Sequence, residues 1–154
     1  MADFTLLYAP NINSYKRFAA GSFAPTTIAW GLDNRTCAVR LVGAGPSARL
    51  ENRLPGGDVN PYLALAAMLA GGLYGIEHEL ELGPALTGNA YTSGLPSVPR
   101  TLRDAREAFA SSAIARSAFG DEVVDHYTNM ADVELAAFDA AVTDWELRRS
   151  FERM

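Results

Sequence analysis

Residues 48–61 read ARLENRLPGGDVNP, and residues 62–73 continue as YLALAAMLAGGL. The first part has the composition of a short strand, in which successive side chains point to opposite faces of a sheet. One face then carries Arg49, Glu51 and Arg53. The other carries Leu50, Asn52 and Leu54. Two interpretations stay open: a carboxylate between two guanidiniums holds a metal and an anion together, or the strand is an ordinary exposed one with neutralised charge.

The second part of this stretch predicts a helix. Asn60 suits the N-cap position, and Pro61 suits the first helical position because no partner is needed there for a backbone N–H. No charged side chain follows as far as Ile76, so we predict a helix buried in the core. Because a helix that crosses a bilayer needs about 20 apolar residues, this run is too short, and we expect no membrane association.

The composition indicates one globular domain. The chain has 154 residues, of which 49% are hydrophobic, and this is enough for a sizeable core. The formal net charge of -5 argues against nucleic-acid binding, which needs a basic surface. Cys37 is the only cysteine, so an internal disulfide and a thiolate zinc cluster are excluded. The N-terminus lacks the basic flank of a signal peptide, and we expect a cytoplasmic protein.

Three strands are predicted in the first half of the chain. Residues 26–30 and 36–42 have strand composition, and Gly31 to Asn34 between them suit a turn. This pattern predicts a hairpin, which the strand of residues 49–53 extends to a three-stranded antiparallel meander. Arg40 lies inside the second strand, where burial without a partner is costly, so we expect an anion beside it.

The second half is predicted to be helical. Residues 83–99 are rich in Gly, Pro, Ser and Thr and form a surface loop. Helices follow from Thr101 to about Ser112, capped by Thr101 with Asp104, and over residues 113–119. An apolar stripe from Val124 to Trp145 predicts one last long helix of about six turns. Its end, residues 150–154, is a candidate oligomer contact. His126 beside Asp125 reads as a surface pair, with a catalytic base as the other interpretation.

Three separated motifs carry further information. They read NSYKR at residues 13–17, DNRTCAVR at residues 33–40, and RLENR at residues 49–53 followed by NPYL at residues 60–63. In this order and spacing, over roughly residues 8–80, they resemble the C-terminal half of the catalytic domain of the glutamine synthetase family. The resemblance implies an α+β fold with a β-rich part, residues 1–58, and a helical part, residues 60–154. It also implies ATP-dependent ligation of an amine to the side-chain carboxylate of glutamate through a γ-glutamyl phosphate.

The resemblance implies roles for individual side chains. Glutamate or the transferred phosphoryl group would be held by Arg17, Arg35 and Arg53, of which the last two would be catalytic. The ATP phosphates would be lined by Arg35, Arg40 and Arg49. Glu51 would be a ligand of a divalent metal, Mg²⁺ or Mn²⁺. These residue types suit phosphoryl transfer, which needs positioned guanidiniums and a metal that bridges phosphate oxygens.

One departure from the family pattern concerns the acceptor amine. In ammonium-using members a glutamate in a mobile flap follows the Lys-Arg motif, and Phe23 occupies its position in this chain. Loss of this carboxylate removes the partner for a small cation and leaves an apolar wall. The chain therefore resembles the γ-glutamyl-polyamine or γ-glutamyl-monoamine ligase branch. The other interpretation is that Phe23 is a packing residue.

A second departure concerns length. Family members are several times longer than the matched segment, and their N-terminal β-grasp domain and further metal ligands precede it. We expect this chain to be the C-terminal portion of such a catalytic domain, without the β-grasp domain. Because Glu51 alone cannot hold a metal pair, we also expect the isolated chain to be inactive. Family members form stacked rings, so the intact protein is expected to be a homo-oligomer. Tyr91 lies near a modified tyrosine of some members, but its surroundings differ, and we interpret it as a loop tyrosine.

Two alternatives to the organic-amine ligase stay open. One is an ammonium-using glutamine synthetase, which differs at the position of Phe23 and in amine preference. The other is a non-catalytic scaffold or oligomerisation module with the same fold. A scaffold would be indifferent to nucleotide and to the arginines.

Overall fold

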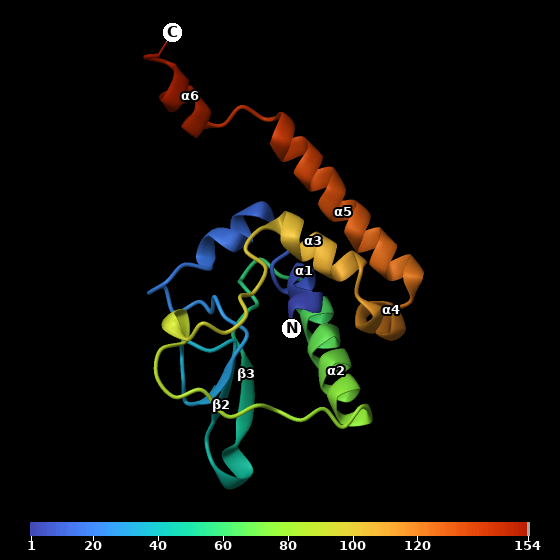
Figure 1. The fold of residues 1–154 in the computed structure, drawn as a ribbon. Helices are drawn as coiled ribbons and strands as arrows, with labels where there is room; N and C mark the ends of the chain where they lie inside the picture. The colour runs from blue at the N-terminus through green and yellow to red at the C-terminus, as the bar shows by residue number, and fades with distance from the viewer. Residues whose placement is uncertain (154) are drawn as a thin grey trace.

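The computed structural model describes residues 1–153 and has a mixed fold of helices and three short strands (Figure 1). The α-helices are α1 (Thr5–Tyr8), α2 (Pro61–Glu77), α3 (Leu102–Ala110), α4 (Ala113–Phe119), α5 (Asp121–Ala140) and α6 (Asp144–Ser150). The strands are β1 (Trp30–Leu32), β2 (Val39–Val42) and β3 (Arg49–Asn52). Short 3₁₀ helices are η1 (Ala2–Phe4), η2 (Ile12–Arg17), η3 (Gly45–Ser47) and η4 (Ala90–Thr92). The predicted α+β class is confirmed.

The strands form one sheet in the order β1-β2-β3. β2 and β3 are antiparallel, as predicted, and place Arg40 opposite Glu51. β1 and β2 are parallel, with Trp30 opposite Val39. The predictions of a hairpin between these two strands and of an antiparallel meander throughout are therefore wrong.

The loop between β1 and β2 explains the parallel pairing. Asp33 has a φ of 48°, so the chain turns away directly after β1. The Asn34 side-chain oxygen then accepts hydrogen bonds from the Thr36 N–H at 3.0 Å and the Thr36 hydroxyl at 2.7 Å. The Asn34 side-chain nitrogen donates to the carbonyl of Gly88 at 2.8 Å. Contact with a distant segment thus holds the loop, and the chain re-enters the sheet in its original direction.

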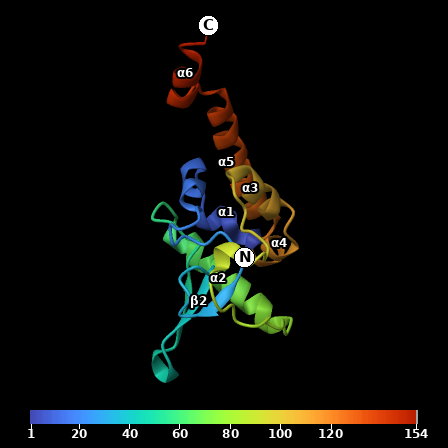
Figure 2. The ribbon, with the colours of Figure 1, turned by 60° about the vertical axis from the view of Figure 1, so that its left-hand side comes forward.

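The core lies between the N-terminal helices, α3 and α5, which pack side by side in both views (Figures 1 and 2). Its largest fully buried side chains include Phe109 on α3 and Val124 on α5. The predicted capping box of α3 is confirmed, because Thr101 and Asp104 each bind the other's backbone N–H at 3.1 Å. Leu54, just beyond β3, is also fully buried and joins the sheet to this core.

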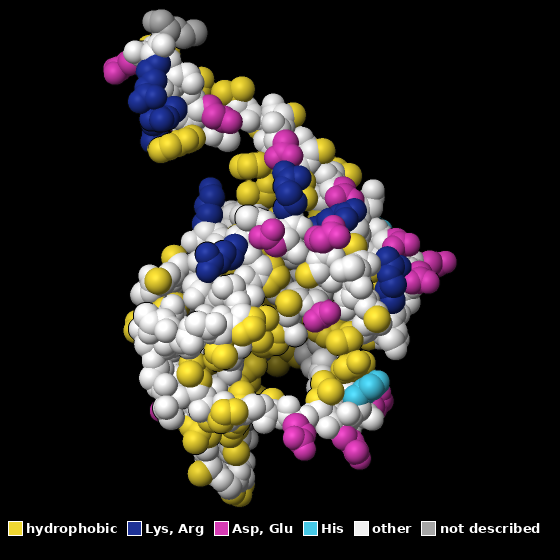
Figure 3. All heavy atoms as spheres, viewed as in Figure 1, with side chains coloured by type: hydrophobic (Ala, Val, Ile, Leu, Met, Phe, Trp, Pro, Cys, Tyr) yellow, Lys and Arg dark blue, Asp and Glu magenta, His cyan; other side chains and the backbone are white. Residues whose placement is uncertain are grey.

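Helix α2 begins as predicted but is not buried as predicted. The Asn60 side-chain oxygen accepts the Tyr62 N–H at 3.0 Å. Only two small side chains of the helix, Ala64 and Ala67, are buried. Its exposed residues include six large apolar ones: Tyr62, Leu65, Met68, Leu69, Leu73 and Ile76. Figure 3 shows apolar side chains gathered around a hollow beside this helix. Because α2 is apolar on all sides, it needs neighbours on more than one side, and residues 1–153 cover only the alanine side.

The last predicted helix is two helices. α5 ends at Ala140, and Ala141 is extended, with a ψ of 135°. Thr143 is the N-cap of α6, and its N–H donates to the Glu146 carboxylate at 2.5 Å. The stripe predicted to continue to Trp145 is therefore interrupted by a second N-cap, and α6 projects from the remainder (Figures 1 and 2). Met154, in the candidate oligomer contact, lies outside the described residues.

Within residues 1–153, no helix combines the length and the apolar character that crossing a bilayer requires.

Candidate active site

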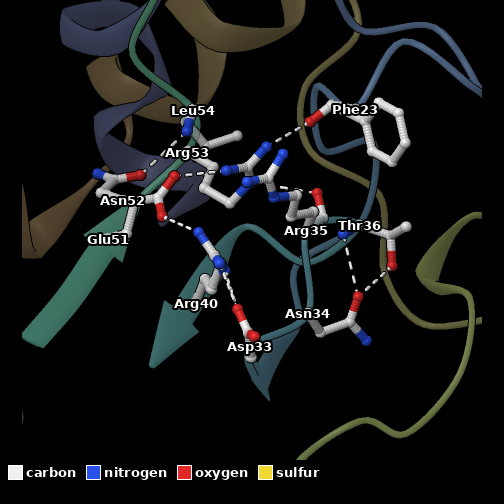
Figure 4. Close-up of polar contacts among 10 residues, drawn as sticks. All are labelled: Phe23, Asp33, Asn34, Arg35, Thr36, Arg40, Glu51, Asn52, Arg53 and Leu54. Atoms are coloured by element: carbon white, nitrogen blue, oxygen red, sulfur yellow. Dashed lines mark hydrogen bonds and ion pairs between the residues drawn. The ribbon is translucent and has the colours of Figure 1, made fainter. Parts of the chain in front are cut away.

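An ion-pair network joins the residue after β1, strand β2 and the end of β3 (Figure 4). Glu51 is at its centre, because Arg40 lies opposite it on the neighbouring strand. Arg40 Nη1 is 2.8 Å from Glu51 Oε2, and Arg53 Nη1 pairs with Oε1. Arg40 also binds the carboxylate of Asp33 through Nε, at 2.9 Å, and through Nη2. Of the two arginines predicted on the same strand face as Glu51, Arg53 pairs with it, and Arg40 from β2 is its second partner.

Arg53 ties the network to two loops. Its Nε donates to the backbone carbonyl of Arg35 at 3.1 Å. Its Nη2 donates to the backbone carbonyl of Phe23 at 2.8 Å. The side chain is only 15% exposed, so three different segments surround one guanidinium. Arg53 therefore positions the Phe23 segment and the Arg35 loop relative to Glu51.

Arg17 contacts the chain just after β3. It is the last residue of η2, whose N-cap is Asn11. Asp58 holds this helix, because its carboxylate accepts a hydrogen bond from the Ser14 hydroxyl at 2.5 Å. The Arg17 guanidinium donates to the carbonyl of Leu54. Burial lowers the pKa of Arg17, and the nearby positive charge of Arg53 adds to this effect, while Asp58 opposes it. The positive charges of Arg17 and Arg53 therefore lie close enough to affect each other.

Arg35, Arg40 and Phe23 line one cavity of about 610 Å³. The rest of its lining comes from β1, the loop after it, and residues 85–88. Phe23 is 59% exposed and has a φ of 59°, a conformation that a bulky residue rarely adopts. An apolar ring thus stands beside two guanidiniums in the same hollow.

Two of the named residues lie apart from this cavity. Arg49 begins β3 opposite Val42 and is exposed. Tyr91 belongs to η4, and its hydroxyl donates to the backbone carbonyl of Ala24 at 3.0 Å. This contact ties η4 to the residue that follows Phe23.

The charges of the network stabilise one another. The hydrogen bond from Arg40 is the largest cause that lowers the pKa of Glu51. The charge of Arg53 and its hydrogen bond to Glu51 lower this pKa further, while burial opposes them. The hydrogen bonds to Asp33 and then Glu51 raise the pKa of Arg40. The carboxylate therefore stays ionised and the guanidinium protonated near neutral pH.

We expect the contribution of Glu51 to stability to vanish in acid. A carboxyl whose pKa is lowered on folding stabilises the folded state above its unfolded value, here 4.5, and this stability is lost as the pH falls through the folded value. The free energy of unfolding of the wild type should exceed that of Glu51→Gln at pH 7, and the difference should shrink from about pH 5 downward. Urea unfolding of both proteins across this range measures it. A difference that stays constant down to about pH 3 would count against these ion pairs.

Glu51 is suited to be one ligand of a metal ion. Glu51 supplies hard oxygen atoms of the kind that Mg²⁺ and Mn²⁺ prefer, although guanidiniums engage both oxygens here. Over residues 1–153, no group of three or more His, Cys, Asp or Glu side chains converges as a complete site requires. The described part of the chain therefore offers part of a ligand set.

The sequence reasoning missed the contribution of the loop after β1 to this site. The sequence pattern predicts a turn at Asp33 and Asn34 and a surface loop over residues 83–99, yet Asp33, Asn34 and residues 85–88 all line the cavity. The available signal was the acidic residue seven positions before Arg40. The parallel pairing that brings it close was not visible in the local pattern.

The model of the family described as "Glutamine synthetase, catalytic domain" matches residues 1–150 of this chain. The chain belongs to the glutamine synthetase family. This confirms the resemblance that the three motifs carry. Two characterised relatives are ligases that use organic amines. Gamma-glutamylethanolamide synthetase GlnA4 of Streptomyces coelicolor is 68% identical over 154 residues, which are 100% of this chain and 33% of that protein. Glutamate–isopropylamine ligase of a Pseudomonas species is 44% identical over 152 residues, 96% of this chain and 33% of that protein.

The fold agrees with a solved family structure. A GmaS/ADP complex superimposes with a TM-score of 0.85 at 32% identity, over 98% of this chain and 36% of that one. This chain spans about a third of the length of the curated relatives that it matches.

Proposed function

We propose that this chain forms the C-terminal portion of the catalytic domain of an ATP-dependent glutamate–amine ligase, with an organic amine as acceptor. One observation carries the proposal: Arg40 and Arg53 converge on Glu51, and the cavity beside them is lined by Arg35, Arg40 and Phe23. The names of relatives such as the ethanolamide synthetase and the isopropylamine ligase support the same reaction class.

In the proposed reaction, the γ-phosphoryl group of ATP passes to the side-chain carboxylate of glutamate, and ADP leaves. The amine then attacks the acyl carbon of the γ-glutamyl phosphate, and inorganic phosphate leaves. Arg35, Arg40 and Arg49 neutralise the phosphate oxygens of the nucleotide as negative charge spreads over them. Arg17, Arg35 and Arg53 orient glutamate and the phosphoryl group, and the adjacent charges of Arg17 and Arg53 suit a carboxylate or phosphate.

Glu51 would hold one divalent cation, Mg²⁺ or Mn²⁺, which would supply positive charge that offsets the negative charge of the phosphates. The remaining metal ligands come, in this proposal, from residues outside this chain, including the portion that carries the β-grasp domain in the family. The isolated chain should therefore bind nucleotide weakly and release no ADP from ATP and glutamate. The proposal includes a ring-shaped homo-oligomer for the intact protein. It also includes a cytoplasmic location, which rests on the single cysteine, Cys37, fully buried here.

We expect Mg-ADP binding that depends on the arginines. Isothermal calorimetry on the chain should detect binding, and Arg49→Ala should weaken it by about tenfold or more, because a charge-assisted contact to phosphate is lost. The matched control is Arg149→Ala, which removes an exposed arginine of α6 far along the chain and should leave the affinity unchanged. Mg-ADP binding of equal affinity in the wild type and in Arg49→Ala would contradict the role of Arg49, and no binding by either protein would favour the scaffold alternative.

Phe23 should determine the choice of amine. Phe23→Glu in a polypeptide that carries the complete catalytic domain should shift the preference toward ammonium, because a carboxylate beside the cavity stabilises a small cation. Phe23→Leu keeps an apolar wall and should retain the preference for an organic amine. The ratio of kcat/KM for ammonium and for ethanolamine measures the shift. An unchanged ratio in Phe23→Glu would support the packing interpretation of Phe23.

A further inference from the structure

The guanidinium of Arg40 is hydrogen-bonded to two carboxylates from different parts of the chain (Figure 4). Glu51 on β3 binds Nη1 at 2.8 Å, and Asp33 after β1 binds Nε at 2.9 Å and also Nη2. All three nitrogens are therefore engaged, and the plane of the guanidinium is set. The two partners differ in exposure: the Asp33 side chain is 74% exposed and that of Glu51 is 39% exposed, while Arg40 itself is only 14% exposed.

Asp33 is itself held in place by the backbone. Its φ of 48° is a left-handed conformation that Asp tolerates better than most residues. Its N–H donates to the carbonyl of Leu41 at 2.9 Å, which continues the parallel pairing of β1 with β2. The next residue, Asn34, is anchored to the carbonyl of Gly88 at 2.8 Å. The carboxylate therefore projects from a loop that is hydrogen-bonded both to β2 and to residue 88.

We propose that Asp33 is a positioning residue that keeps the guanidinium of Arg40 directed at the cavity, where it meets the polyphosphate of the nucleotide. The inference rests on the proposed function, in which Arg40 lines the phosphates of ATP. Glu51 cannot do this alone, because it is also the proposed metal ligand, and its oxygens then serve the cation. Asp33, which lines the cavity together with Arg40, keeps the orientation of the guanidinium independent of Glu51.

The sign of the effect separates positioning from simple electrostatics. Removal of a negative charge beside a phosphate site should tighten the binding of an anion if Asp33 acts only through its charge. Loss of the hydrogen bonds from Arg40 to Asp33 should instead weaken the binding, because nucleotide binding must then include the entropic cost of ordering the guanidinium. The two roles of Asp33 therefore predict opposite changes.

The experiment uses three variants of the whole chain and Mg-ADP as the probe. Asp33→Gly removes the carboxylate and suits the positive φ, and Asp33→Asn keeps one oxygen acceptor without the charge. Asp139→Asn is the matched control, because it disturbs an exposed Arg–Asp pair elsewhere, Arg103 Nη2 to Asp139 Oδ2 at 2.7 Å. Calorimetry should give a Kd about tenfold higher for Asp33→Gly, an intermediate Kd for Asp33→Asn, and a Kd within about twofold of wild type for the control.

A second readout reports on Arg40 without any ligand. In ¹⁵N NMR of arginine side chains, the Arg40 Nε–H signal of the wild type should be shifted and protected from exchange, as expected for a hydrogen bond to a carboxylate. It should lose both properties in Asp33→Gly and keep them in the control.

The outcomes distinguish this inference from the proposed function. If the wild type binds Mg-ADP, and Asp33→Gly binds equally or more tightly, positioning is overturned and the nucleotide site stands. If the wild type does not bind Mg-ADP, the nucleotide site of this chain fails, and the NMR signal decides whether Asp33 orders Arg40. An Arg40 signal that is the same in wild type and Asp33→Gly overturns the inference under either result.

Discussion

Leu54→Ala should lower the free energy of unfolding by about 2–5 kcal/mol. Leu54 is 0% exposed, so truncation removes buried methyl groups and leaves a cavity that the core refills only in part. The same residue supports the site, because its carbonyl accepts a hydrogen bond from Arg17 and its N–H donates to the Asn52 side chain at 3.1 Å. Urea unfolding followed by circular dichroism measures the loss.

The control is the same substitution on the preceding strand. Leu50 lies on β3 and is 66% exposed, so Leu50→Ala should change the free energy of unfolding by no more than about 0.5 kcal/mol. Similar losses for the two variants would contradict the burial of Leu54 that joins the sheet to the helical core.

Arg53→Ala should cost about 2–3 kcal/mol of stability, because hydrogen bonds to charged groups contribute more than neutral ones and the acceptors left behind are partly buried. The substitution removes the donors to Glu51 and to the carbonyls of Arg35 and Phe23. It should also release the Phe23 segment from the Arg35 loop. The urea midpoint measures stability, and the rate of limited proteolysis at residues 19–25 measures the release.

Two further variants test the reason for this loss. Arg103→Ala removes a pair in which both side chains are more than half exposed, Arg103 with Asp139, and should cost at most about 0.5 kcal/mol. Arg53→Lys keeps the charge beside Glu51 but cannot donate in three directions from a planar group, so it should recover only part of the stability. Full recovery by lysine would mean that charge alone, and not the shape of the guanidinium, holds the loops.

Local signals predicted the starts of the helices well. Asn60 caps α2, and Thr101 with Asp104 caps α3. Gly120, with a φ of 80°, follows α4 directly, and the predicted end of this helix at residue 119 is confirmed. These features depend on hydrogen bonds between residues two to four positions apart, so the sequence contains all the participants.

Non-local features were predicted less well. The parallel pairing of β1 with β2 depends on Asn34, whose side chain binds a carbonyl more than fifty residues away. The prediction that α2 is buried was wrong, because an apolar pattern shows that a helix can be buried but not which of its sides has a neighbour. The break after Ala140 was missed because the apolar period continues across a second N-cap at Thr143.

Some features of the candidate site likewise follow from the sequence, and others depend on the tertiary structure. The sequence by itself determined the family, the set of arginines and the carboxylate between them, because these are residue types at fixed spacings. It also determined that Glu51 and Arg53 share a strand face, which follows from the alternation of side chains. Only the tertiary structure decided that Asp33 and Arg40 meet, that Arg53 holds the Phe23 segment, and that residues 85–88 close the cavity. These contacts join segments whose distance is set by sheet register and by packing against the core, and no local pattern of residues encodes either.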